Sequence, residues 1–286
     1  MNKRQLKTKL PYKDKTYQWS KDIIREKLHF ASGSELLQYV VHMDNYAVSA
    51  MMMAMYDFDK DPLEGKYKAV IFDQNHGIVL STRNTRQIIG DFLNNEIFEY
   101  QLGLAVQKEI ARSMNLNRYH ALSFNKFAFF SLKGFTNGKT SWLNLSALTE
   151  FSLHRRNASF TSVEVNGSRH IFCFDKVVAN LDKVLSEAIT HNLVVKRGLL
   201  AYESKLMGRP VVSGREKKSL LNDSQYFAYE IMPKCDANYL VSMSKGIWHD
   251  IFLLFGKRLF KLLEINWNYE DYKEAYKHNN RINYLR

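Results

Sequence analysis

Four acidic side chains are the first candidates for chemistry in this chain, because several carboxylates near a lysine can hold the magnesium ion of a nuclease. They are Asp73, Asp91, Glu164 and Asp175. Their spacing does not indicate a shared site, and Glu164 alternates with Val163 and Val165 in the pattern of the polar face of a strand. A metal-dependent nuclease, or another enzyme that acts on nucleic acid, therefore stays an alternative hypothesis.

Other residues with metal or catalytic chemistry fall into no known motif. The chain has no glycine-rich phosphate loop, no His-Glu-x-x-His helix and no Gly-x-Ser-x-Gly elbow. Cys173 and Cys235 are the only cysteines, no histidine pair stands near them, and Cys173 sits in an apolar strand pattern typical of a core residue. His76 has no evident partner and is interpreted as a turn residue, and Met51–Met53 as core filling. The sequence predicts a protein that is not an enzyme and has no metal or cofactor.

The charge balance favours a polyanionic partner. The 286 residues carry 41 Lys and Arg against 29 Asp and Glu, which gives a net charge of +12 and a pI of about 9.5. Such an excess favours nucleic acids or acidic membrane surfaces. A basic enzyme, or a basic module that meets an acidic protein or a membrane surface, fits the same charge.

Two features argue against membrane insertion. The apolar run Ile251–Phe255 is too short to span a bilayer, and the basic start of the chain lacks the apolar core of a signal peptide. We therefore expect a cytoplasmic protein without stable membrane insertion.

Asn-Gly pairs between runs of strand formers predict two hairpins in the centre of the chain. Both central residues of a tight two-residue turn need positive φ, which Asn and Gly adopt at low cost. Asn166-Gly167 lies between Thr161–Val165 and Arg169–Phe174, and Asn137-Gly138 marks the second turn. A sheet built from these hairpins would present the residues of its turns to a partner.

Basic side chains on or beside these turns, and in the basic stretch that follows, are the predicted DNA contacts. Lys and Arg neutralise phosphates, and Arg in an extended arm suits the narrow minor groove of A·T-rich DNA. His170 is expected to be presented in the same way. The residues predicted to contact phosphate or the minor groove are Lys133, Lys139, Arg155, Arg156, Arg169, Lys196, Arg197 and Arg209.

Apolar spacing predicts the remaining elements, and Asp175 stands where a helix N-cap would stand. The predicted segments are a short amphipathic helix in Trp19–Phe30, two strands in Leu36–Tyr56, strands in Lys66–Asp73 and Ile78–Thr82, one or two helices in Asn84–Met114 broken near Gly103, a helix over Asp175–His191, a basic stretch over Val194–Ser219 and mostly helix in Gln225–Arg286. The sequence predicts an α+β fold with a central, mostly antiparallel β-sheet, hairpins, packed helices and a helical C-terminal extension.

The order of these segments resembles the ComK family of competence transcription factors over about residues 39–191. The similarity starts with YVVHMDNYAVSAMMMAMYDFDKDPLEGKYKAVIFDQNHGIVLSTRNTRQIIGDF and continues through the strands of Lys126–Leu145 with Trp142. It ends with VEVNGSRHIFCFDKVVANLDKVLSEAI, a strand, turn, strand and helix. The predicted organisation is a basic N-terminal arm over 1–38, a ComK-like core over 39–191, a basic loop or hinge over 192–224 and a helical region over 225–286.

The resemblance implies a bacterial DNA-binding activator of genes for DNA uptake. Members of the ComK family bind A·T-rich boxes largely through the minor groove as oligomers, and an adaptor delivers them to a protease. On this basis we expect double-stranded DNA, a homo-oligomer, an adaptor and protease, and RNA polymerase as partners, with a nucleoid-associated location.

Overall fold

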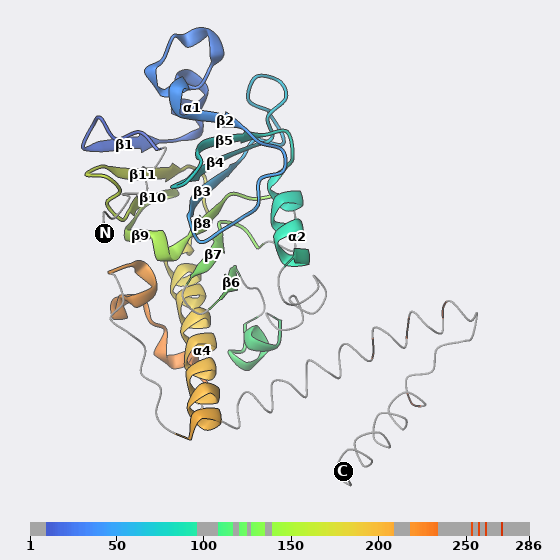
Figure 1. Cartoon of the computed structure of the whole chain (residues 1–286). Helices are drawn as coiled ribbons and strands as arrows, with labels where there is room; N and C mark the ends of the chain where they lie inside the picture. Colours follow the sequence, from blue (N-terminus) through green and yellow to red (C-terminus); the bar gives the residue numbers. More distant parts are fainter. Residues whose placement is uncertain are drawn as a thin grey trace, which may run out of the picture.

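Two mostly antiparallel β-sheets form the centre of the molecule, and helices lie beside them (Figure 1). The structure is a computed structural model that describes residues 10–95, 108–116, 120–124, 127–134, 139–208 and 218–233, together with single positions at 253, 257, 261 and 270. Helices and antiparallel strands occur together, so the predicted α+β fold class is confirmed. Most of the predicted helical C-terminal extension lies outside the described residues.

The strands and helices have the following bounds. The strands are β1 Thr16–Trp19, β2 Val40–His42, β3 Met52–Asp57, β4 Ala69–Asp73, β5 Gly77–Ser81, β6 Ala121–Ser123, β7 Ala128–Ser131, β8 Trp142–Asn144, β9 Leu148–His154, β10 Asn157–Ser162 and β11 Arg169–Phe174. The helices are α1 Lys21–Lys27, α2 Thr85–Asn95 and α4 Leu181–Met207, and residues 108–113 form a further helical segment.

Each sheet ends in a parallel strand from the N-terminal part of the chain. The larger sheet has the order β2-β5-β4-β3-β8-β7-β6, in which only β2 and β5 are parallel. The smaller sheet has the order β1-β11-β10-β9, in which β1 runs parallel to β11. The two strands predicted in Leu36–Tyr56 are therefore present as β2 and β3, but they do not pair with each other.

The predicted hairpins are present. Asn166 and Gly167 adopt φ of 52° and 79°, the left-handed values that a two-residue turn between antiparallel strands requires. The strands on either side of Asn137-Gly138, β7 and β8, also pair antiparallel, although the turn itself lies outside the described residues. The connection between β4 and β5 is a tight turn as expected.

Aromatic side chains from both sheets share one core. Trp19 of β1 lies 4.6 Å from Phe72 of β4, and Tyr56 of β3 lies 4.6 Å from Phe174 of β11, measured between ring centres. The opposite face of the larger sheet packs against α2 through side chains that include Met52. Met51 is 39% exposed, so the interpretation of the methionine run as core filling is correct for two of its three residues.

The predicted N-terminal arm is wrong for the part of 1–38 that the structure describes. β1 hydrogen-bonds to β11, and Trp19, Ile24 and Leu28 are almost completely buried. The segment packs on the sheets because its short helix has an apolar face. This helix was predicted correctly; it is α1, and the Ser20 hydroxyl caps its N-terminus. The basic residues of this segment lie on the surface of the core, not on a free arm.

The helix predicted over Asp175–His191 begins and ends later. Asp175 is not its N-cap, because α4 starts at Leu181 and continues to Met207, where Gly208 ends it with a φ of 63°. The first half of the predicted loop or hinge over 192–224 is therefore helical. This stretch was interpreted as a loop because it is rich in charged residues, but it also makes an apolar contact, in which Val194 packs on Ile110 and Met114.

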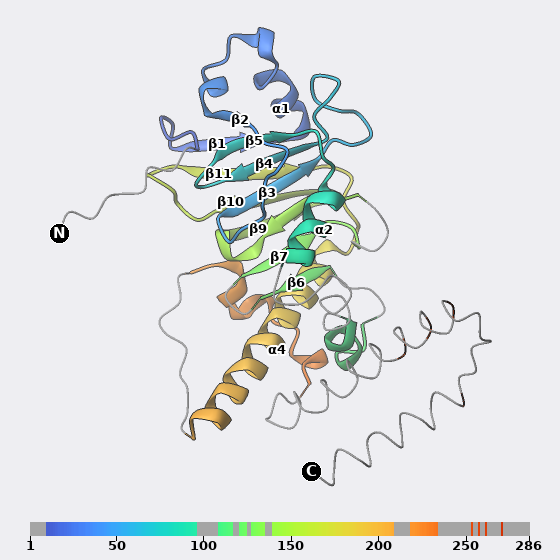
Figure 2. The same ribbon diagram turned by 45° about the vertical axis from the view of Figure 1, so that its right-hand side comes forward.

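The two views agree that α4 starts beside the sheets and that its C-terminal half projects away from them (Figures 1 and 2). Residues 218–233 contain three 3₁₀ turns, Leu220–Asn222, Ser224–Tyr226 and Tyr229–Ile231, so the first residues of the region predicted to be mostly helical from Gln225 are not α-helical. The single positions described beyond them, 253, 257, 261 and 270, are α-helical. None of the helices that the structure describes combines the length and the apolar character that a bilayer crossing needs.

Candidate nucleic-acid interface

A groove of about 680 Å³ opens between the start of α4 and loops from both sheets, and we call it the basic groove. Five of the side chains that line it are Lys or Arg, and one is Glu. The lining residues are Asn115, Leu116, His120, Lys133, Gly134, Lys139, Arg156, Lys176, Val178, Asn180, Lys183, Val184 and Glu187. Such a surplus of cations in one concave surface attracts phosphate groups.

The loop between β7 and β8 supplies two of the five cations. Lys133 and Lys139 lie on its two sides, and both side chains are exposed. The backbone amide of Lys133 donates to Thr140 Oγ1 at 3.1 Å, which ties the two ends of the loop together. Lys139 forms an ion pair with Asp59 of the loop between β3 and β4.

Arg156 is the most firmly held cation of the basic groove. It belongs to the two-residue turn between β9 and β10, in which Arg155 has a φ of 55°. Arg156 Nε donates to the Val177 carbonyl at 3.0 Å, and the Val177 amide donates back to the Arg156 carbonyl at 2.9 Å. These bonds fix the guanidinium group beside the loop that leads from β11 to α4.

That loop and the first turns of α4 supply the other two cations. Lys176 has a φ of 55°, a left-handed conformation that is uncommon for a residue other than glycine. Lys183 lies 4.0 Å from Glu187 one turn further along the helix. Burial raises the pKa of the Glu187 carboxyl, and the positive charge of Lys183 opposes this shift.

The predicted DNA contacts divide into three groups. Lys133, Lys139 and Arg156 line the basic groove, and Arg155 is exposed on the turn next to Arg156. Arg169 is exposed at the opposite end of β10 and β11 from that turn.

The remaining candidates lie on or beyond the distal half of α4. Lys196 and Arg197 are on this helix, about 20 Å along it from Lys183 at 1.5 Å per residue. Arg197 is exposed, and its Nη1 lies 3.0 Å from the sulfur of Met232. Arg209 lies outside the described residues.

Lys176 and Lys183 are the groove residues that the sequence did not single out. Lys183 stands on the polar side of the predicted helix, so an inspection of the charges along that side could have identified it from the sequence. No pattern in the sequence indicates that the loop after β11 faces the loop after β7. That proximity follows from the packing of the two sheets.

His170 is not presented to a partner, contrary to expectation. It alternates inward along β11 and is completely buried. Trp19 Nε1 donates to His170 Nδ1 at 3.1 Å, while His170 Nε2 has no hydrogen-bond partner. Burial lowers the pKa of His170 to about 4, so the ring is neutral at physiological pH.

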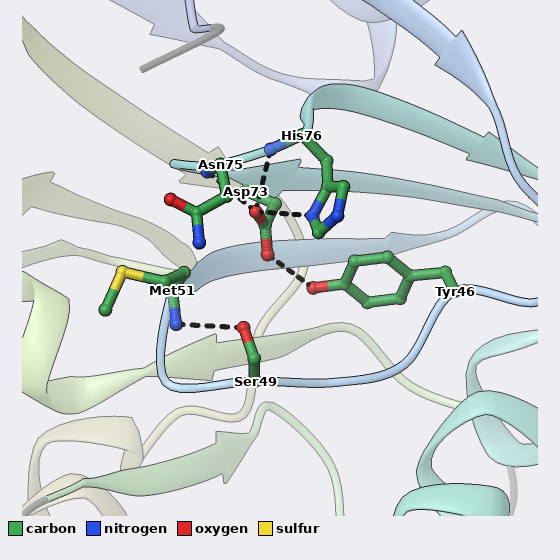
Figure 3. Close-up of polar contacts among 6 residues, drawn as sticks. All are labelled: Tyr46, Ser49, Met51, Asp73, Asn75 and His76. Atoms are coloured by element: carbon green, nitrogen blue, oxygen red, sulfur yellow. Dashed lines mark hydrogen bonds and ion pairs between the residues drawn. The ribbon is translucent and has the colours of Figure 1, made fainter. Parts of the chain in front are cut away.

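The carboxylate of Asp73 is completely buried and stabilises the turn between β4 and β5 (Figure 3). The Tyr46 hydroxyl donates to Oδ2 at 2.8 Å, and the amides of Asn75 and His76 donate to Oδ1 at 2.8 and 3.0 Å. His76 Nδ1 lies 3.0 Å from the same Oδ1, so His76 does have a partner, contrary to the sequence interpretation. Burial raises the pKa of Tyr46 well above its usual range, which keeps the hydroxyl as a donor.

We expect Asp73→Asn to lower the free energy of unfolding by about 2 kcal/mol, because one of the two acceptor oxygens becomes a buried donor that faces other donors. Urea unfolding measures the change. Asp91→Asn is the matched control, since Asp91 is exposed on α2 and paired with Arg83, and its change should stay within about 0.5 kcal/mol. Equal stability of the two variants would contradict this account of Asp73.

The four acidic candidates do not form a common site in the described part of the chain. Asp73 is enclosed, Asp91 pairs with Arg83, and Glu164 and Asp175 are exposed beyond the ends of β10 and β11. Among the residues that the structure describes, no three His, Cys, Asp or Glu side chains gather as the ligands of one metal ion would. Cys173 is half-buried and not in the core, because its side chain points to the side of β11 opposite to Phe172 and Phe174.

Comparisons of the chain with protein-family models, with curated proteins and with solved structures find no match.

Proposed function

We propose that this chain is a DNA-binding protein whose basic groove contacts the phosphate backbone of a duplex. The observation that supports the proposal most strongly is the convergence of five cations from separate elements on one concave surface. Three of them were predicted as DNA contacts from turn chemistry alone. A fixed arginine beside four lysines offers both a directed hydrogen-bond donor and mobile point charges to phosphate.

The proposal extends to gene activation through the resemblance to the ComK family. On that reading the duplex is A·T-rich. Exposed arginines next to the basic groove of the protein, such as Arg155, then enter the narrow minor groove of the DNA. The groove of about 680 Å³ holds only part of a duplex backbone, so an extended site requires further contacts or a second copy of the chain. Assembly into a homo-oligomer is part of the proposal.

The experiment compares binding of the whole chain to A·T-rich and G·C-rich duplexes at two salt concentrations, without and with magnesium. We expect tighter binding to the A·T-rich duplex, a steep loss of affinity as salt rises, and intact DNA. Equal weak binding to both duplexes would reduce the function to a nonspecific basic surface. Shortening of the DNA only with magnesium would replace the proposal with the nuclease.

A further inference from the structure

The loop between β3 and β4 places a run of carboxylates beside cations at one rim of the basic groove. We call residues 57–61, with Asp57 at the end of β3 and Asp59 and Asp61 in the loop that follows, the acidic loop. Asp59 pairs with Lys139, which lines the basic groove. Asp61 Oδ2 lies 2.6 Å from Arg25 Nη2 of α1.

The positive surface continues from the basic groove to α1. Desolvation lowers the pKa of Lys21; the negative charges of Asp57 and Asp61 oppose this shift, while Arg25 and Lys133 add to it, so Lys21 lies among charges of both signs. The Lys21 ammonium lies 5.2 Å from the centre of the Phe58 ring, and the Arg25 guanidinium lies 5.1 Å from it. Phe58 precedes Asp59, whose partner Lys139 lines the basic groove, so Lys21 and Arg25 continue the positive surface from this rim toward α1.

The acidic loop is fixed in this position by the fold. Phe58 is 1% exposed, and its amide donates to the Lys68 carbonyl at 2.8 Å. The amide of Asp57 donates to Ser141 Oγ at 3.0 Å, which ties the loop to the start of β8. Because these contacts already order the start of the loop, its carboxylates pair with the rim cations at a small cost in conformational entropy.

We propose that the acidic loop competes with DNA phosphates for the cations of the rim and so weakens the binding of DNA by the basic groove. The proposal rests on the DNA-binding function proposed above. A carboxylate and a phosphate oxygen accept the same hydrogen bonds from an ammonium or guanidinium group, so each rim cation serves one of them at a time. A phosphate that reaches Lys139 must displace Asp59, which then repels it.

The test removes the carboxylates while keeping the shape of the side chains. Asp59→Asn and Asp61→Asn should each tighten binding to a short A·T-rich duplex about threefold, and the double variant about tenfold. The double variant should also show a salt dependence that is steeper by about one to two phosphate contacts. Asp91→Asn is the control, because it removes the same charge from an ion pair on α2 that lies outside the basic groove.

The outcomes separate this inference from the function on which it rests. If the wild-type chain binds DNA but Asp59→Asn and Asp61→Asn bind it no more tightly than Asp91→Asn does, the competition is overturned and DNA binding is left intact. No binding by the wild-type chain would overturn the proposed function and this inference together. The Asp61 side chain is 79% exposed, so Asp61→Asn keeps the test decisive even if Asp59→Asn perturbs folding.

Discussion

Removing three lysines from the basic groove is expected to weaken binding to a short A·T-rich duplex by about a hundredfold. The variant combines Lys133→Ala, Lys176→Gly and Lys183→Ala. Each lysine that neutralises a phosphate adds about one to the slope of log affinity against log salt, so that slope should fall by about three. Glycine is chosen at position 176 because the φ of 55° there lies in the left-handed region, where glycine is unstrained.

The matched control removes the same number of charges elsewhere. Lys15, Lys66 and Arg86 are exposed and do not line the basic groove. Their joint replacement by Ala should weaken binding less than about tenfold, through the loss of net charge alone. Fluorescence anisotropy titrations at several salt concentrations measure both variants. Equal losses in the two variants would show that the basic groove is not the binding surface.

The second large effect is a loss of stability at acidic pH that comes from His170. Burial holds the pKa of this side chain at about 4, against an ordinary value of 6.5 in the unfolded chain. Below about pH 6.5 the unfolded state therefore binds a proton that the folded state does not, and unfolding is favoured. The contribution to stability is complete above that pH and falls by about 3 kcal/mol as the pH drops to about 4.

The measurement is the free energy of unfolding in urea at a series of pH values between about 4 and 7. His170→Phe keeps a flat ring between Tyr17 and Phe172 but cannot be protonated, so its stability should fall by about 3 kcal/mol less than that of the wild type over this range. His154→Gln, at an exposed position of β9, is the control and should behave as the wild type. Parallel curves for the wild type and His170→Phe would refute this role.

Local signals explain which parts of the fold were predictable. Asn166-Gly167 identified its hairpin because the turn requires positive φ at both positions, and the apolar spacing of Ile24 and Leu28 identified α1. The parallel pairing of Thr16 with Arg169 carries no such signal, because the two strands are far apart in the sequence. The N-terminal segment was therefore interpreted as an arm although it completes a sheet.

The basic groove was predictable to the extent that its residues flank turns. Lys133, Lys139 and Arg156 were found in this way, since turns are exposed and lysine and arginine there can reach a partner. Lys176 was missed because α4 begins later than the Asp175 position indicated, which leaves a loop where a helix was expected. The pairing of Lys139 with Asp59 depends on two loops 80 residues apart and has no counterpart in the sequence pattern.

Photocrosslinking tests most directly whether DNA occupies the basic groove. Asn180 lines the groove and is exposed, and its side chain makes no cap hydrogen bond to α4, so a photoreactive amino acid can replace it at small cost to the fold. Irradiation of the complex with a short A·T-rich duplex should crosslink DNA to position 180 and not to the same photoreactive residue at position 91 on α2. Crosslinking at position 91 without crosslinking at position 180 would contradict the assignment of the basic groove as the DNA-binding surface.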